Sequence, residues 1–170
     1  MVHVKWPLRW PLELADGLVA LHSYDQDDAG HLFGALGDQR GWEHIPRQIP
    51  RTALELDEMI RSKLGDGYRA TFTIRERGTV VGMTSVLYDV RHPAGVEIGG
   101  TQLAPRVWGT GVNGRAKRLL LDEIFAQGTE WSCSGPTSAI NGPRQPSPSW
   151  APETSGSIRT PACAETAPNA

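Results

Sequence analysis

The chain has 170 residues, of which 39% are apolar and 21% charged, and its net charge near −2 leaves no large field of one sign. That charge balance does not favour extensive phosphate contacts to nucleic acid or electrostatic binding to an anionic membrane. No apolar run approaches the roughly 18 residues of a membrane span, and Pro7 and Pro11 break the N-terminus before any signal-peptide core. We therefore expect a cytoplasmic chain with at most one globular domain.

The first half of the chain predicts one irregular strand and two helices. Residues 8–14 are apolar with polar residues interleaved, but Pro11 makes any strand there irregular or an edge. Residues 25–36 carry acids in their first turn and apolar residues at helical spacing, which predicts a short amphipathic helix. Residues 52–64 predict a second helix, with a Thr52/Glu55 capping box and a stop at Gly65.

The pattern then changes to that of strands. Residues 68–75 and 79–88 are rich in β-forming residues and are joined by Glu76, Arg77 and Gly78, which predicts a hairpin. Residues 95–103 predict a third strand, and a helix follows from Gly111 or Val112 to Phe125. The order of strand, two helices, three strands and helix favours an α/β fold with a mostly antiparallel sheet flanked by helices.

The composition changes near Gly128. Residues 129–170 hold seven of the thirteen prolines and seven serines, and they contain no Leu, Val, Phe or Met. Such a segment cannot bury enough apolar surface to offset its ordering entropy. We expect residues 1–127 to form the organised core, and residues 128–170 to form a low-complexity tail that is disordered or loosely docked.

The sequence does not favour a metal site or a disulfide. Cys133 and Cys163 lie far apart without C-x-x-C spacing, so neither a disulfide scaffold nor a zinc site is expected. The five histidines show no H-x-x-x-H or H-E-x-x-H spacing, and no G-x-S-x-G motif marks a serine hydrolase. The acids at Asp25, Asp27 and Asp28 are explained more simply as helix-start residues than as ligands. We expect no metal.

The most informative stretch is L-A-P-R-V-W-G-T-G-V-N-G-R-A-K, residues 103–117, between a predicted strand and a predicted helix. Gly109, Gly111 and Gly114 spell G-x-G-x-x-G, the dinucleotide fingerprint. In that fold the glycines follow the strand almost directly and open a βαβ unit, whereas here residues 104–108 intervene after a meander. A third interpretation is that these glycines only form a turn.

Residues 106–111 also fit R/Q-x-x-G-x-G/A, which resembles the pyrophosphate loop of the GNAT superfamily of N-acetyltransferases. In that family the loop amides hold the pyrophosphate of acetyl-CoA at a helix N-terminus, where N–H groups and the helix dipole favour an anion. The resemblance implies acetyl-CoA as the acyl donor and a set of contact residues on the strand, the loop and the helix start: Thr101, Gln102, Leu103, Arg106, Trp108, Gly109, Thr110, Gly111, Val112 and Asn113. Lys117 and Arg118 are weaker candidates for the phosphates, because a solvated helix face explains them equally well.

The resemblance covers roughly residues 8–126. The run from Val96 to Asn113, V-E-I-G-G-T-Q-L-A-P-R-V-W-G-T-G-V-N, is similar to the branch that contains the ribosomal-protein N-terminal-alanine acetyltransferases. The front of the chain adds R-W-P-L, the Asp27–Asp28–Ala29 helix entry, Trp42 with Pro46, and T-V-V-G at residues 79–82, although a large aromatic such as Trp42 usually packs in a core.

The resemblance implies direct attack of an amine on the thioester, with a carboxylate or a water relay as base. Glu97, on the strand before the loop, is the candidate base; its alternative is a structural carboxylate on a half-exposed strand. A strand amide would polarise the thioester carbonyl. The acceptor is then a protein N-terminal amine or a small amine. The competing functions are a non-catalytic remnant that binds CoA or a nucleotide, and a nicotinamide-dependent oxidoreductase.

The sequence departs from the family after Phe125, where a fifth strand and a helix introduced by N-x-x-S should follow. Read two nucleotides out of register, the codons of residues 136–156 can encode T-D-E-R-N-Q-R-S-A-A-A-I-A-K-L-G-A-R-D-L-G, the missing helix. Our hypothesis is therefore an out-of-frame tail from about Gly128, testable by the gene's nucleotide sequence, with the C-terminal strands and helix of the fold missing. We expect strand 95–103 to have an unpaired edge, the last helix to lack packing partners, and the chain to be marginally stable and weakly active or inactive.

Overall fold

The computed structural model describes residues 6–11, 13–43, 49–65, 67–88, 95–129 and 131–134, the last four as backbone only. Its strands form one sheet in the order in which they occur along the chain: β1 (Leu14–Ala15), β2 (Val19–Ser23), β3 (Arg69–Glu76), β4 (Thr79–Tyr88), β5 (Gly95–Leu103) and β6 (Trp131–Ser134). Neighbouring strands are antiparallel as far as β5, and β6 joins β5 in parallel. The sheet is therefore mostly antiparallel, as the sequence predicts.

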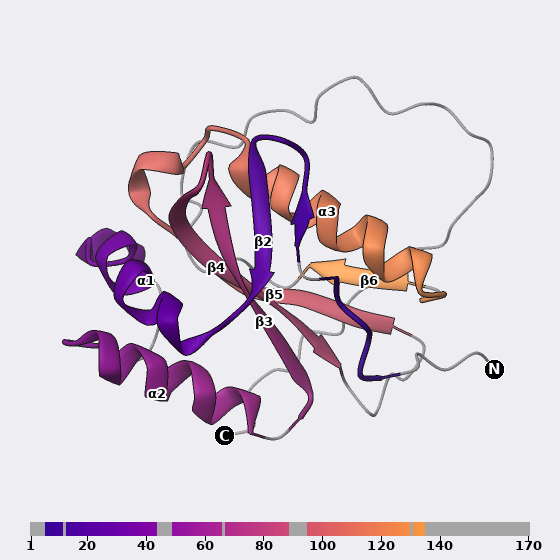
Figure 1. The fold of residues 1–170 in the computed structure, drawn as a ribbon, viewed down its shortest axis with the longest axis horizontal. Coiled ribbons are helices and arrows are strands. Elements are labelled where there is room, and N and C mark those ends of the chain that lie inside the picture. Colours follow the sequence, from indigo (N-terminus) through magenta and orange to yellow (C-terminus); the bar gives the residue numbers. More distant parts are fainter. Residues whose placement is uncertain are drawn as a thin grey trace, which may run out of the picture.

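Three α-helices and three short 3₁₀ turns connect these strands. The helices are α1 (Ala29–Ala35), α2 (Ala53–Leu64) and α3 (Val112–Ala126), and the turns are η1 (Gln26–Asp28), η2 (Gln39–Gly41) and η3 (Pro105–Val107). Figure 1 shows α1 and α2 on one side of the strands and α3 on the other. The resulting α/β arrangement agrees with the fold that the sequence resemblance implies.

The hairpin of β3 and β4 forms where it is predicted. Arg77 and Gly78 both have positive φ values, 48° and 81°, which is the conformation of a tight two-residue turn whose twist matches the strands. Strands β4 and β5 have the predicted boundaries. The turn chemistry and the β-rich composition are thus sufficient to define this part of the sheet.

The helix starts also follow from local chemistry. Thr52 caps α2, with its hydroxyl accepting from the amide of Glu55 at 3.1 Å. The reciprocal half of the predicted capping box is absent, because the Glu55 carboxylate accepts instead from the amide of Arg51 at 2.7 Å. Asp25 likewise accepts from the amide of Asp27 at the start of η1, so the predicted helix over 25–36 is a 3₁₀ turn followed by α1.

The N-terminal strand predicted over 8–14 is wrong. Only Leu14–Ala15 pair with β2, and Pro11 has no amide to donate to a ladder. The Arg9 amide donates instead to the side chain of Gln127 at 2.8 Å. The sequence analysis also missed β2, although Val19 and Leu21 alternate with more exposed residues in the period of two that marks a strand.

Apolar side chains pack on both faces of the sheet. On one face Val96 and Ile98 of β5 contact the buried stripe of α3, formed by Ala116, Leu120 and Ile124. On the other face α1 and α2 cover a second cluster, whose members are Leu32, Leu36, Trp42, Leu56, Ile60, Val80 and Met83. Trp42 is 4% exposed and donates to the Leu36 carbonyl at 2.7 Å, so it is a core residue.

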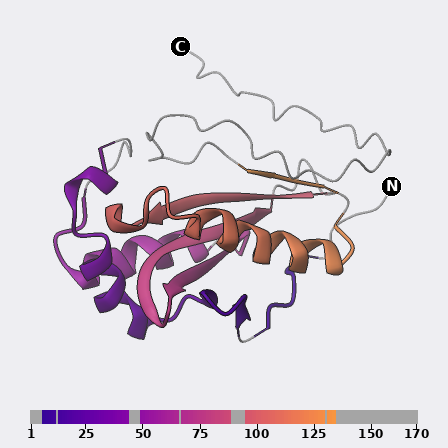
Figure 2. The same cartoon turned by 90° about the horizontal axis from the view of Figure 1, so that it is seen from above.

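Two expectations about the C-terminal part of the sheet are wrong. Strand β6 pairs with residues 95–98 of β5, so that half of the strand has no open edge. Leu120 and Ile124 are fully buried, so α3 does not lack packing partners. Gly128, with φ 83°, reverses the chain after α3 and returns it beside β5, and Figure 2 shows α3 running along these strands. The rest of the predicted tail lies outside the described residues.

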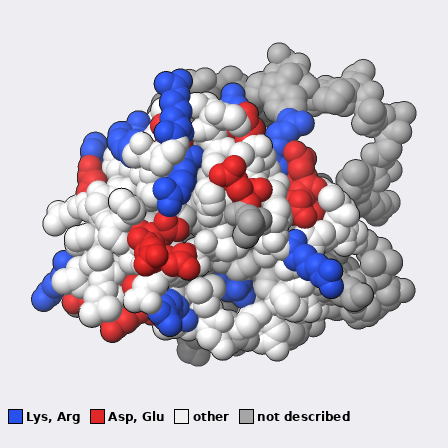
Figure 3. Space-filling model, viewed as in Figure 1, with Lys and Arg blue, Asp and Glu red and all other residues white. Residues whose placement is uncertain are grey.

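Charged side chains are mixed on the surface. Figure 3 shows Lys and Arg interleaved with Asp and Glu on the face in view, without one sign covering it. Within the described part of the chain, no helix combines the length and the apolar character needed to cross a membrane.

A substitution at Gly82 tests how closely β4 and β5 approach each other. A Cβ built on Gly82 would lie 2.1 Å from the Gln102 carbonyl oxygen, whereas one on Gly34 in α1 would meet nothing within 4 Å. We expect Gly82→Ala to lower the free energy of unfolding by about 1–3 kcal/mol, because backbone must move. Gly34→Ala should raise it by up to about 1 kcal/mol. Urea denaturation of both variants checks this, and equal stabilities would contradict the strand register.

Asp16 makes the stability of the folded chain depend on pH. Its carboxylate accepts from the Val19 amide, the Arg115 guanidinium and the Leu18 amide, which lower its pKa from 3.8 to about 2. A lowered carboxyl pKa contributes stability that is present above pH 3.8 and is lost as the pH falls toward 2. We expect Asp16→Asn to lower Tm at pH 6 and to have a much smaller effect near pH 2. A Tm difference independent of pH would exclude the ion pair as its cause.

Candidate functional site

A bulge in β5 is the centre of the site. Ser85 pairs with Gly99 and Met83 with Gln102, so two residues of β5 stand opposite Thr84 alone. Gly100 has φ 61°, a conformation that glycine adopts at little cost. The ladder with β6 ends at Ile98 and Ser134, just before this bulge. Among the described residues, the segment 99–103 therefore continues without a strand on its β6 side.

The turn after β5 is firmly attached to its neighbours. The Ala104 amide donates to the Val81 carbonyl at 2.8 Å. The Trp108 indole donates to the Leu103 carbonyl at 2.9 Å, and the Thr110 hydroxyl donates to the Val107 carbonyl at 2.8 Å. Side chains of the loop thus satisfy the carbonyls of the strand end and of η3, which fixes the path of residues 104–110 into α3.

The helix α3, which follows the loop, begins without a side-chain cap. Gly111 is the N-cap of α3, with φ 88° and no side-chain cap. The first backbone bond of the helix runs from the Arg115 amide to the Gly111 carbonyl. The preceding amides, of Val112, Asn113 and Gly114, have no acceptor within the helix by its geometry, and they create a positive end that favours an anion.

The space in front of this helix end is open. A Cβ built on Gly109, Gly111 or Gly114 would meet no atom within 4 Å, and Gly109 also has a positive φ of 74°. The glycines therefore leave room for a ligand to approach the backbone closely. An anion would have room to approach the free amides of the helix start.

Arg106 takes a different position from the loop glycines. Its guanidinium donates to the Val80 carbonyl at 3.1 Å, so the side chain lies along the start of β4. The part of the loop that faces the open space is therefore backbone, and the Arg106 side chain anchors the loop to the sheet.

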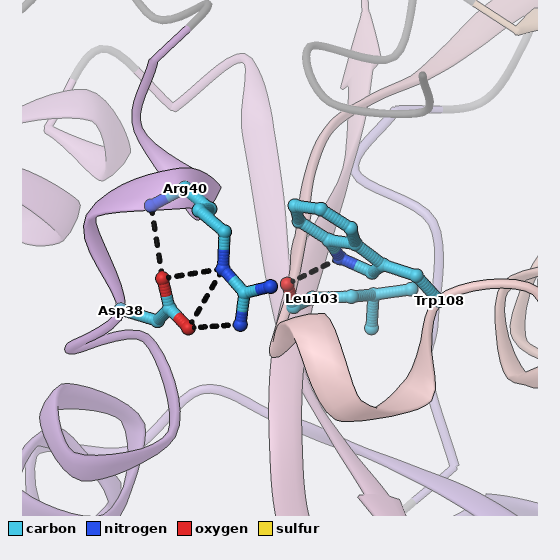
Figure 4. Close-up of polar contacts among 4 residues, drawn as sticks. All are labelled: Asp38, Arg40, Leu103 and Trp108. Atoms are coloured by element: carbon cyan, nitrogen blue, oxygen red, sulfur yellow. Dashed lines mark hydrogen bonds and ion pairs between the residues drawn. The ribbon is translucent and has the colours of Figure 1, made fainter. Parts of the chain in front are cut away.

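A pocket of about 680 Å³ lies between α1 and the turn after β5, with His31, Asp38, Arg40, Thr79 and Arg106 among its lining residues. Figure 4 shows the Asp38–Arg40 pair facing Leu103 and Trp108. Arg40 donates to Asp38 at 2.6 Å and holds the pKa of that carboxyl below its usual range. The sequence analysis did not predict this pocket, because its walls come from segments far apart in the chain.

Glu97 lies at the bulge, on the face opposite to α3. Its cross-strand partner on β4 is Leu87, and its neighbours along the strand, Val96 and Ile98, point into the core beneath α3. The side chain is half-buried, and one carboxylate oxygen would lie 2.8 Å from a Cβ on Gly99. A carboxylate therefore lies near the end of the described β5–β6 ladder.

Thr101, Gln102 and Leu103 lie beyond the bulge, on the part of β5 that has no β6 partner among the described residues. Lys117 is half-buried on α3, and burial lowers its pKa. Arg118 is exposed and lies 3.9 Å from Asp122. The described residues contain no cluster of three or more His, Cys, Asp and Glu side chains that could hold a metal.

Two polar residues at the bulge were missed by the sequence analysis. Arg69 of β3 donates to Ser85 of β4 at 3.3 Å, and its guanidinium lies over Gly100. The signal that could have located them is the pair Gly99–Gly100, because glycine inside a strand pattern often marks a bulge or a close approach.

Comparison with known proteins agrees with this geometry. The acetyltransferase (GNAT) domain family matches residues 19–143. A comparison with curated protein sequences found no significant match. A probable acetyltransferase of the GNAT family from Chromobacterium violaceum has a similar structure, with a TM-score of 0.65, 20% identity, and coverage of 76% of this chain and 69% of that one.

Two further structures resemble the chain at lower identity. An acetyl transferase from Salmonella typhimurium, which modifies the N-terminal serine of ribosomal protein L7/L12, has a TM-score of 0.58, 15% identity, and coverage of 69% and 70%. The ribosomal L7/L12 acetyltransferase RimL in complex with coenzyme A has the same TM-score and coverage at 14% identity.

The chain spans about two thirds of the length of these structures. Their low identities establish a shared fold, while the domain match includes the bulged strand, the glycine loop and α3. On that match, the chain belongs to the GNAT family of acetyltransferases.

Proposed function

We propose that this chain transfers an acetyl group from acetyl-CoA to a primary amine. The observation that carries the proposal is the uncapped N-terminus of α3, which begins at Gly111 after the turn that follows β5. A dinucleotide-binding oxidoreductase is disfavoured, because residues 104–110 separate β5 from α3, whereas the glycines of the dinucleotide fingerprint follow their strand almost directly.

The loop and the helix start bind the pyrophosphate of acetyl-CoA in this proposal. The backbone amides of Gly109, Gly111, Val112 and Asn113 converge on the anion, and the helix dipole adds to their attraction. The Thr110 amide donates instead to the Val107 carbonyl at 3.3 Å and holds the loop. One solved structural neighbour is a complex with coenzyme A, which supports the assignment.

The strand beyond the bulge binds the pantetheine arm. Backbone groups of Thr101, Gln102 and Leu103 are its partners, in the manner of a strand added to an edge. Trp108 and Arg106 act indirectly: their side chains donate to the Leu103 and Val80 carbonyls and hold the loop at the end of the strand.

Glu97 accepts a proton from the acceptor amine, directly or through a water, so that the nitrogen lone pair can attack the thioester. A backbone amide at the bulge polarises the thioester carbonyl. The location of Glu97 beside Gly99, at the end of the β6 ladder, supports this role. The acceptor is a protein N-terminal amine or a small amine, and the Salmonella neighbour acts on an N-terminal serine.

The residues assigned to both substrates lie within residues 1–127. We propose that this core carries substrate binding and that residues 128–170 are the out-of-frame tail of the hypothesis above. Restoring the alternative frame should increase acetyl transfer, because the family places a further helix beside the thiol end of CoA.

The loop glycines provide a test of CoA binding. Gly109→Val and Gly111→Val should each abolish measurable CoA binding, because both positions have positive φ and a β-branched side chain would stand in the ligand's path. Isothermal titration calorimetry with CoA measures this. Gly34→Val, on α1, is the control and should bind CoA like the parent chain. Unchanged affinity in both loop variants would mean that the loop is only a turn.

Glu97 provides a test of the chemistry, made in the frame-restored chain. Glu97→Gln should lower kcat by about 10²–10⁴-fold, the usual contribution of a general base, with little change in acetyl-CoA affinity. Thiol release at saturating acceptor measures kcat. The matched control is Glu58→Gln on the exposed side of α2, which should retain full activity. Equal kcat in Glu97→Gln and the parent would assign the base elsewhere.

A further inference from the structure

The way in which α3 is turned on the sheet follows from Arg115. Its guanidinium donates to Asp16, in the turn between β1 and β2, at 2.7 Å, so this flank of the helix faces the β1 side of the sheet. Asn113 and Lys117 lie one turn from each other on the opposite flank, beyond the buried stripe of the helix. That opposite flank therefore faces β5 and β6.

Lys117 lies level with the bulge of β5. α3 ends at Ala126, and the chain then pairs Trp131 with Gly95. Lys117 precedes the end of the helix by nine residues, which is about 13.5 Å along its axis. The four residue steps from Gly95 to Gly99 cover about 13 Å of strand. Because α3 runs back against the two parallel strands that it connects, Lys117 lies beside the segment where the described β6 ladder has ended.

Neither polar group of this flank has a partner in the described part of the chain. Asn113 Oδ1 is buried without a hydrogen bond. Lys117 is half-buried without an ion pair or hydrogen bond to a described residue, and burial lowers the pKa of its ammonium group. A buried acceptor without a donor and a half-buried cation without an anion both cost free energy. Both groups therefore indicate a ligand along this flank.

CoA bound along the strand edge supplies both missing partners. With the pyrophosphate at the start of α3, the pantetheine arm passes Asn113 first and Lys117 second. An amide N–H of the arm donates to Asn113 Oδ1. We propose that the ammonium group of Lys117 contacts the sulfur of CoA and protonates the thiolate as it leaves. This inference rests on the proposed function, and it makes Lys117 a second catalytic residue beside Glu97.

The reaction balances without a further reagent. The acceptor nitrogen forms a bond to the acetyl carbon, and the bond from that carbon to sulfur breaks, with its electron pair going to sulfur. Two protons leave the ammonium group of the acceptor through Glu97 to solvent. Lys117 gives one proton to the thiolate and recovers one from solvent, so one proton is released in all.

The surroundings of Lys117 suit a general acid. A lysine has an ordinary pKa of about 10.4 and a thiol one of about 8.5, so burial brings the acid closer to the group that it protonates. The neighbouring cations of α3 are compensated: Arg115 pairs with Asp16, and Arg118 lies 3.9 Å from Asp122. Glu97 lies on the opposite face of β5. The Lys117 charge is therefore available to a ligand.

The thiol of bound CoA tests the contact directly. CoA carrying ¹³C at the carbon bonded to sulfur is mixed with an excess of the full chain, and its NMR shift is followed with pH. We expect the thiol pKa to lie at least about one pH unit below that of free CoA, the usual effect of an opposite charge within about 4–6 Å. Lys117→Met should return it to the free value or above. Lys117→Arg, which keeps a cation, should retain the lowered pKa.

A second ligand and two further variants locate the contact. 3′-Phosphoadenosine 5′-diphosphate is CoA without its pantetheine arm. Lys117→Met and Asn113→Ala should each bind it within about twofold of the parent in calorimetry, which also shows that both variants fold. Asn113→Ala should weaken CoA binding by about three- to tenfold, the range for one neutral hydrogen bond. Arg118→Met removes the next cation of α3, on its exposed side, and should leave the thiol pKa unchanged.

Three results would each overturn the inference: a thiol pKa in the parent complex equal to that of free CoA, the same lowered pKa in Lys117→Met, or an equal loss of affinity for both ligands in Lys117→Met. The last result would assign the lysine to the phosphates. Failure of the full chain to bind CoA would instead overturn the proposed function on which the inference rests.

Discussion

The bulge at Gly100 and Thr101 is the constraint on which the rest of the site depends. Before it, β5 pairs with β4 on one side and with β6 on the other; after it, only the β4 ladder continues among the described residues. A Cβ on Gly99 would lie 2.8 Å from a Glu97 carboxylate oxygen, and a Cβ on Gly100 would lie 3.1 Å from an Arg69 guanidinium nitrogen, so a side chain at either position would push against one of these groups. Glycine at these two positions thus leaves room for the charged groups beside β5.

The two faces of the sheet differ: one packs against the apolar side of α3, and the other carries charged side chains. On one face, α3 packs through Ala116, Leu120 and Ile124, and this apolar contact aims the positive end of the helix at the loop. On the other face, the Glu97 carboxylate lies beside Gly99, and the Arg69 guanidinium lies beside Gly100 and donates to Ser85. A donor bound along the strand edge would therefore present its acyl group to a carboxylate of β5 on the face opposite to α3.

Buried polar contacts hold that opposite layer in place. Asp28, at the start of α1, accepts from the Thr73 hydroxyl at 2.7 Å and from Arg75 at 2.6 Å, both on β3. The Tyr24 hydroxyl donates to Asp57 of α2 at 2.7 Å, and burial together with that carboxylate raises the pKa of Tyr24. Removing one member of such a pair would leave a buried charge or donor unsatisfied, which costs more than the bond itself contributes. These bonds therefore fix α1 and α2 against the sheet.

The sequence by itself determined the features that depend on near neighbours. Thr52 predicts the start of α2, Arg77 and Gly78 predict the hairpin turn, and the glycine spacing of the loop predicts the uncapped start of α3, because each relies on contacts within a few residues. Only the tertiary structure decided the pairing of β6 with β5, the place of β2, and the alignment of Arg69 and Glu97 on either side of Leu87. Cross-strand neighbours are set by register between distant segments, and a bulge shifts that register by a residue, so no local pattern in β3 indicates which residue of β5 it will face.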